Sequence, residues 1–89
     1  MSISTAGIGN QLHVVIVDGG RVLHRIQHLD GSWTPWAIIV TPEGQEFVEA
    51  SCANSGNGLR VLLKDVAGLY WHDIRKQNGQ WQGVAQLPV

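Results

Sequence analysis

The chain has 89 residues, a formal net charge of −1 and only 15% charged residues. A chain this short usually needs a staple, such as disulfides, a metal or a partner subunit. Its single cysteine, Cys52, excludes an internal disulfide, and its four histidines show no metal-ligand spacing. Oligomerisation is therefore the expected staple, and neither a metal nor a cofactor is expected.

The sequence also excludes several partners. No basic stripe is present, which argues against nucleic-acid binding. No apolar stretch approaches the ~20 residues that cross a bilayer, so no membrane span is expected. The N-terminus carries no signal-peptide pattern, so we expect a protein that is cytoplasmic or released without a classical signal peptide.

Short apolar runs alternate with turn residues along the whole chain, which predicts strands and no helix. The strands are expected near Ile3–Ala6, Leu12–Val17, Val22–His28, Trp33–Val40, Phe47–Ala53, Leu59–Lys64, Leu69–Arg75 and Trp81–Leu87. The pairs Gly19-Gly20, Asp30-Gly31 and Asn78-Gly79 supply the positive φ angles of tight turns, and Ser55–Gly58 predicts a looser turn of the same kind. Pro42–Gln45 is the expected connection between two halves of the chain.

The two halves resemble each other. Residues 9–18 and 56–65 share Gly, Asn, Leu, Val and Asp at an offset of 47. Farther on, Asp30–Trp33 corresponds to Asn78–Trp81 at an offset of 48, which predicts one extra residue between His72 and Asn78. A repeat of this length that is made only of short strands is typical of a β-propeller blade.

The class expected from this pattern is all-β, with one four-stranded antiparallel blade in residues 1–42 and another in residues 43–89. The runs Val14–Val17 and Val61–Leu63 are apolar without alternation, as in strands buried on both faces. Two blades cannot close a ring and would leave apolar faces exposed. We therefore expect a head-to-tail ring of three chains and six blades, with four chains and eight blades as the alternative.

The motifs Asp18-Gly19, Val22–Gln27 and Gly31-Ser32-Trp33-Thr34-Pro35-Trp36 resemble a tectonin-type blade of the Photorhabdus lectin group. The resemblance covers nearly the whole chain in two copies. Two slots depart from it in the second copy, where Trp71-His72 replaces His-Arg and Val84 replaces the second Trp. The layout is also similar to fucose-binding propellers in which two-repeat chains trimerise. The resemblance implies a multivalent lectin that binds fucose or related, often methylated, sugars in clefts between blades.

Tryptophan is about three times as frequent as in an average protein. Aromatic rings stack on the C–H faces of sugars, and polar neighbours bind the hydroxyls. Trp33 and Trp81 share one repeat slot, which also fits packing between blades, whereas Trp36 and Trp71 are not repeated. The candidate ligand-binding residues are Trp33, Trp36, Trp71, Trp81, His24, Arg25, Arg60, Tyr70 and His72.

Two other functions are weighed against the lectin. The diverged slots of the second copy fit a structural or protein-interaction propeller, engineered or reconstructed, that has no natural ligand. An enzyme is not expected, because no catalytic set of residues occurs in the sequence. Glu46 and Glu49 are three residues apart at a strand entry, where two carboxylates rarely face each other across a substrate.

Overall fold

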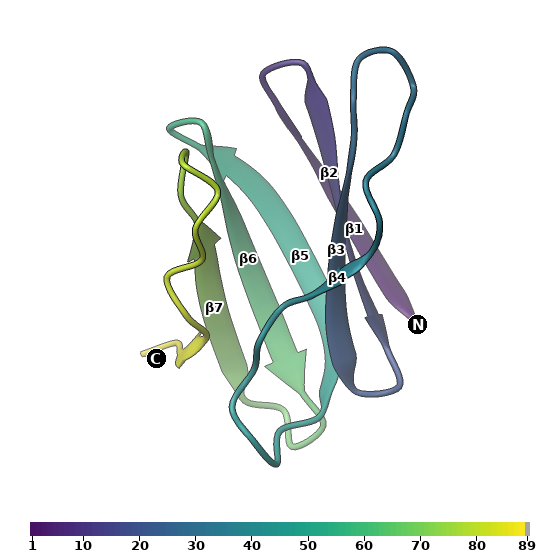
Figure 1. The fold of residues 1–89 in the computed structure, drawn as a ribbon. Helices are drawn as coiled ribbons and strands as arrows, with labels where there is room; N and C mark the ends of the chain where they lie inside the picture. Colours follow the sequence, from purple (N-terminus) through teal and green to yellow (C-terminus); the bar gives the residue numbers. More distant parts are fainter. Residues whose placement is uncertain (89) are drawn as a thin grey trace.

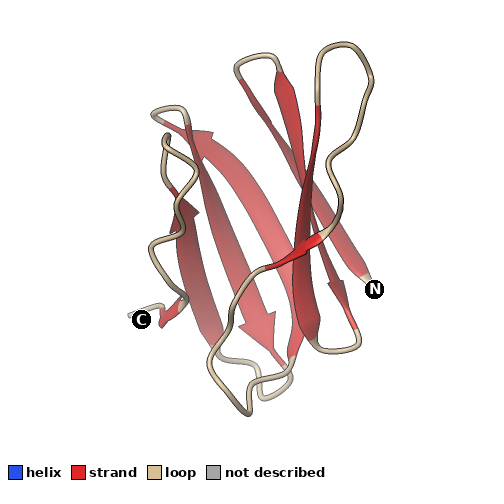
Figure 2. Cartoon of the chain, in the orientation of Figure 1, coloured by secondary structure: helices blue, strands red, loops and turns tan. Residues whose placement is uncertain are grey.

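The chain folds into two four-stranded antiparallel sheets, and residues 1–88, which this computed structural model describes, contain no helix. Figures 1 and 2 show the sheets as two neighbouring layers. The all-β class is thus confirmed; Val89, the last residue of the second expected blade, lies outside the described residues. The first sheet contains β1 (Ser2–Ile8), β2 (Gln11–Asp18), β3 (Arg21–Gln27) and β4 (Ala37–Ile38), and the second contains β5 (Phe47–Ser55), β6 (Gly58–Asp65), β7 (Tyr70–Arg75) and β8 (Ala85–Gln86).

The hairpin turns follow from the glycines of the sequence. Gly19 and Gly20, which join β2 to β3, have φ angles of 60° and 80°. This left-handed conformation is the one that a two-residue hairpin turn requires. Ser55–Gly58 is also a tight turn and not the looser one expected, because Gly56 and Asn57 both adopt positive φ, at 58° and 63°.

The fourth strand of each sheet is much shorter than expected. β4 and β8 have two residues each, and Trp33 and Trp81 make only isolated bridges to Gln27 and Arg75. Between bridge and strand the first sheet loses its ladder where Pro35 has no N–H and the Thr34 hydroxyl accepts the backbone N–H of Ile26 at 2.9 Å; in the second sheet the Asp73 side chain accepts the backbone N–H of Gly83 at 2.9 Å. The expectation of long strands over Trp33–Val40 and Trp81–Leu87 was therefore wrong.

Strand pairing corrects the alignment of the two halves. Val17 pairs with Val22 in the first sheet, and its counterpart Lys64 pairs with Tyr70 in the second. The extra residue therefore lies in the β6–β7 turn, where Leu69 N–H donates to Asp65 Oδ1 at 2.8 Å, and not between His72 and Asn78. From Tyr70 onward the offset is 48. The counterparts of His24 and Arg25 are consequently His72 and Asp73, and not Trp71 and His72.

The core lies between the two sheets. Its most deeply buried side chains come from both layers: Val15, Val17, Val22 and Ile39 from the first, and Phe47, Leu59, Val61 and Leu63 from the second. Polar contacts join the inner strands, since the hydroxyls of Ser2 and Ser4 accept the backbone N–H groups of Ala50 and Cys52 at 3.3 and 3.0 Å. Cys52 is half-buried on β5, and burial raises the pKa of its thiol.

Each sheet also has an outward face. In the first sheet, Ile3, Val14, Ile16, Leu23 and Arg25 point away from the second sheet; we call this set the first open face. The second open face consists of Arg60, Leu62, Lys64, Tyr70 and His72. The run Val14–Val17 is buried throughout, as expected, but Leu62 is 45% exposed, so the run Val61–Leu63 is buried on one side only.

The two open faces are related by the repeat. Leu59, Val61 and Leu63 pack against the first sheet, and their counterparts Leu12, Val14 and Ile16 belong to the opposite face of that sheet. The first sheet thus turns outward the face that the second sheet turns toward the core, and on it Ile3 is exposed while Val14 and Ile16 are covered by neighbouring side chains of the same chain. Within residues 1–88 no helix is long and apolar enough to cross a bilayer.

Candidate functional site

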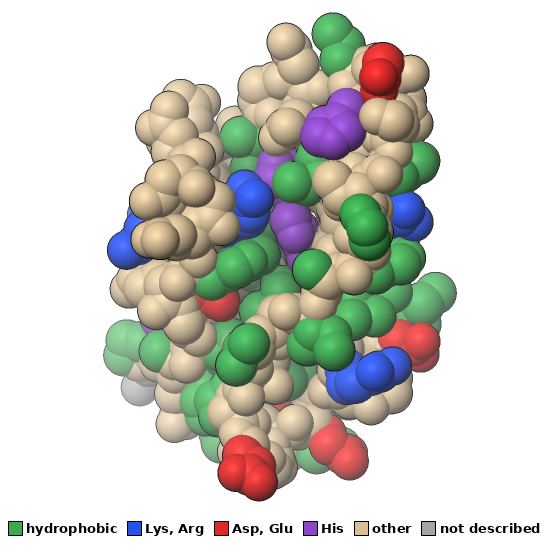
Figure 3. Space-filling model, viewed as in Figure 1, with side chains coloured by type: hydrophobic (Ala, Val, Ile, Leu, Met, Phe, Trp, Pro, Cys, Tyr) green, Lys and Arg blue, Asp and Glu red, His purple; other side chains and the backbone are tan. Residues whose placement is uncertain are grey.

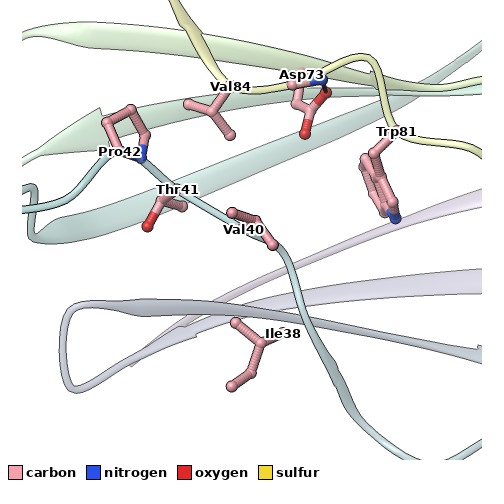
Figure 4. A pocket seen from close by; sticks show the side chains of 8 residues that line it. Ile38, Val40, Thr41, Pro42, Asp73, Trp81 and Val84 are labelled. Carbon is pink, nitrogen blue, oxygen red and sulfur yellow. Dashed lines mark hydrogen bonds between the residues drawn. The ribbon is translucent and has the colours of Figure 1, made fainter.

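A cleft opens between the sheets where the chain passes from β4 toward β5 (Figure 4). It encloses about 470 Å³, within the range of about 300–1,000 Å³ that is typical of small-molecule sites. One side comes from the segment after β4, and the other from β7 and the segment before β8. We call this the inter-sheet cleft; it is lined by Ile38, Val40, Thr41, Pro42, Asp73, Trp81, Gly83 and Val84.

Asp73 is the charged side chain of this cleft. It is 2% exposed, and its Oδ1 accepts the backbone N–H groups of Ile74 at 2.7 Å and Gly83 at 2.9 Å. Its Oδ2 is buried without a hydrogen-bond partner, and in Figure 4 the carboxyl group points into the space between the sheets. Burial raises the pKa of Asp73. A buried oxygen without a hydrogen-bond partner costs free energy. The site therefore favours a ligand that donates a hydrogen bond to Oδ2.

A histidine pair lies beside the cleft. His13 Nδ1 and His24 Nε2 are 2.9 Å apart, both side chains are buried, and the edge of Trp81 meets His24 at a centroid distance of 5.3 Å. Burial first, and then the charges of His13 and Arg75, together lower the pKa of His24 to about 4. Figure 3 shows histidine side chains in the groove between the layers, next to a basic side chain.

A second hollow between the sheets has the opposite charge. It encloses about 330 Å³ at the end where the β1–β2 and β5–β6 turns lie, and Arg75 and His13 line it together with Gln11 and Gln77. Arg75 is two residues from Asp73 on β7 but lines this hollow and not the inter-sheet cleft. An acidic and a basic opening are therefore separated along one strand.

Three of the expected site residues form a cluster on the first open face. The Arg25 guanidinium lies 4.8 Å from the ring centre of Trp33 and 4.9 Å from that of Trp36, and its Nε donates to the carbonyl of Thr34 at 3.0 Å. Both indoles are exposed, at 44% and 41%. Cation–π contacts with Arg25 thus fix the positions of both indole rings at a surface that the chain itself leaves uncovered.

Three more expected residues lie on the second open face, away from that cluster. Arg60 is exposed, His72 is half-buried, and Tyr70 borders a small hollow of about 150 Å³ with Leu62 and Lys64. Within one chain the nine expected residues are therefore divided among four places: the two open faces, the inter-sheet cleft and, for Trp71, the core. Of these nine residues only Trp81 lines the inter-sheet cleft, and His24 lies beside it against the edge of Trp81.

Trp71 has a structural position. Its Nε1–H donates to Asp65 Oδ2 at 2.9 Å, and its ring meets Phe47 edge-on at 6.2 Å. The hydrogen bond from Trp71 is the main cause that lowers the pKa of Asp65. The ring thus packs against the core and does not line the cleft.

Asp73 was not among the residues expected at a site, and neither was His13. An acidic residue in the middle of an apolar strand is unusual, and Asp73 follows Tyr70-Trp71-His72, so its residue type was a usable signal. The misplaced extra residue concealed it, because the alignment set Asp73 against Ile26 and not Arg25.

Residues 1–88 hold no group of three or more His, Cys, Asp or Glu side chains that could bind a metal ion. No family model, curated protein or solved structure matches the chain. The function must therefore be inferred from the fold and from the geometry of the clefts.

Proposed function

We propose that this protein is a multivalent carbohydrate-binding lectin whose chains close head to tail into a β-propeller and take sugars between blades. One observation carries the proposal: Trp81 and Asp73 line the same inter-sheet cleft, and Asp73 Oδ2 is buried there without a hydrogen-bond partner. An aromatic ring accepts the apolar side of a sugar, and a carboxylate oxygen accepts its hydroxyl donors.

The ring supplies a second cleft of the same kind. The counterparts of Asp73, Trp81 and Val84 are Arg25, Trp33 and Trp36 on the first open face. A neighbouring copy that stacks its second open face there would add Arg60 and His72, the counterparts of His13 and His24. Each chain would then contribute to two unlike clefts, one internal and one shared.

Binding is tested by applying the assembled protein to a glycan array that includes fucosylated and O-methylated sugars. Trp36→Ala is expected to weaken binding about tenfold or more, because loss of a stacked aromatic ring removes roughly 1–2 kcal/mol. Leu29→Ala is the matched control, since Leu29 is an exposed side chain, 78% accessible, in the turn after β3.

Retention of the fold by both variants is checked by circular dichroism. An array on which the unmodified ring binds no sugar would contradict the lectin. In that case a ring confirmed by its native mass would be assigned to a structural or protein-interaction propeller.

A further inference from the structure

We infer that the inter-sheet cleft selects a sugar that carries a protonated amine, with Asp73 as its counter-charge. This inference rests on the proposed lectin function and adds a ligand class for one of its two clefts. It concerns the cleft within a single chain, so it does not depend on the number of chains in the ring.

The two oxygens of Asp73 are in unlike situations. Two backbone N–H groups hold Oδ1, at 2.7 and 2.9 Å, which fixes the orientation of the carboxyl group. Oδ2 has no partner among the described residues, although the residue is only 2% exposed. The carboxyl group is therefore preorganised, and its remaining acceptor sites are left for a ligand.

The surroundings of Asp73 provide no counter-charge in the cleft. Its other lining side chains are apolar or, at Thr41, a neutral hydroxyl. The nearest basic groups lie elsewhere: His72 on the second open face, Arg75 at the second hollow, and the histidine pair behind Trp81. A buried carboxylate without a counter-charge costs free energy among apolar side chains. A ligand ammonium would offset this cost more fully than a neutral hydroxyl does.

The same slot in the first sheet carries the opposite charge. Arg25 is the counterpart of Asp73, and its guanidinium is held between Trp33 and Trp36. An ammonium ligand would be repelled there. The amine preference therefore belongs to the Asp73 cleft, and the shared cleft would take neutral or anionic sugars.

The inference is tested by titrating the assembled protein at pH 7 with methyl glucosaminide and with its N-acetyl derivative. The free amine is expected to bind about tenfold more tightly, because a charge-assisted hydrogen bond is about twice as strong as a neutral one. Asp73→Asn should abolish that difference. Asp18→Asn, which changes an exposed acid at the end of β2, should keep it.

Three outcomes would overturn the inference: an N-acetyl sugar that binds as tightly as the amine, an amine preference that survives in Asp73→Asn, or no binding of either sugar. In the first two, sugar binding and thus the lectin would stand. If Asp73→Asn does not fold, the carboxyl carbon signal of Asp73 in the unmodified protein replaces it. That signal should shift on addition of the amine, and an unchanged signal would refute the contact.

Discussion

At the scale of single residues, the buried polar groups between the sheets control the response to pH. His13 and His24 are neutral in the folded chain, because burial and the nearby charge of Arg75 lower the pKa of both imidazoles. An unfolded chain returns each to an ordinary value near 6.5. At a pH between the folded-state pKa and the unfolded-state pKa, the unfolded chain binds more protons than the folded chain. Lowering the pH through this range therefore favours unfolding.

The chain is therefore expected to lose stability as the pH falls from about 6.5 to about 4, by up to roughly 3 kcal/mol from His24. Asp73 opposes this trend at the acidic end, because its raised pKa makes the folded state bind more protons there. Urea unfolding at several pH values measures the slope.

The double variant His13→Leu/His24→Leu should flatten that slope, because neither side chain then gains a proton on unfolding. His28→Gln, which changes an exposed histidine after β3, should leave it unchanged. Equal slopes in the double variant and the unmodified chain would show that other groups cause the acid sensitivity.

At the scale of elements, β5 connects the two layers. Phe47 begins this strand, is 1% exposed, and donates its backbone N–H to the Gly20 carbonyl of the β2–β3 turn at 3.1 Å. Its ring also meets Trp71 edge-on. Phe47 thus contacts both layers: its side chain packs against the second sheet, and its backbone N–H is bonded to the first.

Phe47→Ala should lower the free energy of unfolding by about 3–5 kcal/mol, because it leaves a cavity in the core. Val48→Ala changes the next residue, which is 43% exposed, and should cost less than about 0.5 kcal/mol. Chemical denaturation of both variants measures the difference. Similar losses in the two would place the core elsewhere.

Local signals predicted most of the elements. The hairpins around Gly19-Gly20 and Asn78-Gly79 depend on glycines that can be read directly, and they were found where expected. The ends of the sheets could not be predicted, because β4 is limited by the bond from Ile26 N–H to Thr34, a contact eight residues apart.

The candidate site was predicted less well than the fold. The length of the β6–β7 turn decides whether Trp71 or His72 occupies the position of the second copy that is equivalent to His24. Short degenerate motifs do not fix that length. Asp73 emerges as a site residue only when strand pairing has set the register and burial has shown that its Oδ2 lacks a partner. Both are properties of the folded chain.

At the scale of the whole molecule, the proposed ring depends on the two open faces. The first carries apolar side chains such as Ile3, which is 63% exposed. The second carries Leu62 at the position where the first sheet buries Val15. Because the repeat makes each open face the counterpart of a face that packs between the two sheets, the proposed ring predicts a second copy as the cover of each.

A trimer should have a native mass of about 29 kDa and a tetramer about 39 kDa, from a chain of 9.7 kDa. Leu62→Arg should reduce the mass to that of one chain while circular dichroism keeps its β signal, because Leu62 is 45% exposed in the single chain. Glu43→Arg, an exposed change in the connection between the sheets, should leave the mass unaltered. A folded, unmodified protein that stays monomeric at micromolar concentration would contradict the ring.

The short contact between His13 Nδ1 and His24 Nε2 has a further consequence. One nitrogen must carry the hydrogen and the other must be bare, so the two neutral rings are held in matched tautomers. Separating β2 from β3 would release both rings to the mixture of tautomers that free imidazole adopts in water. The ¹⁵N shifts of these two side chains therefore provide an internal spectroscopic reporter of whether the β2–β3 hairpin of the first sheet is closed, without any attached label.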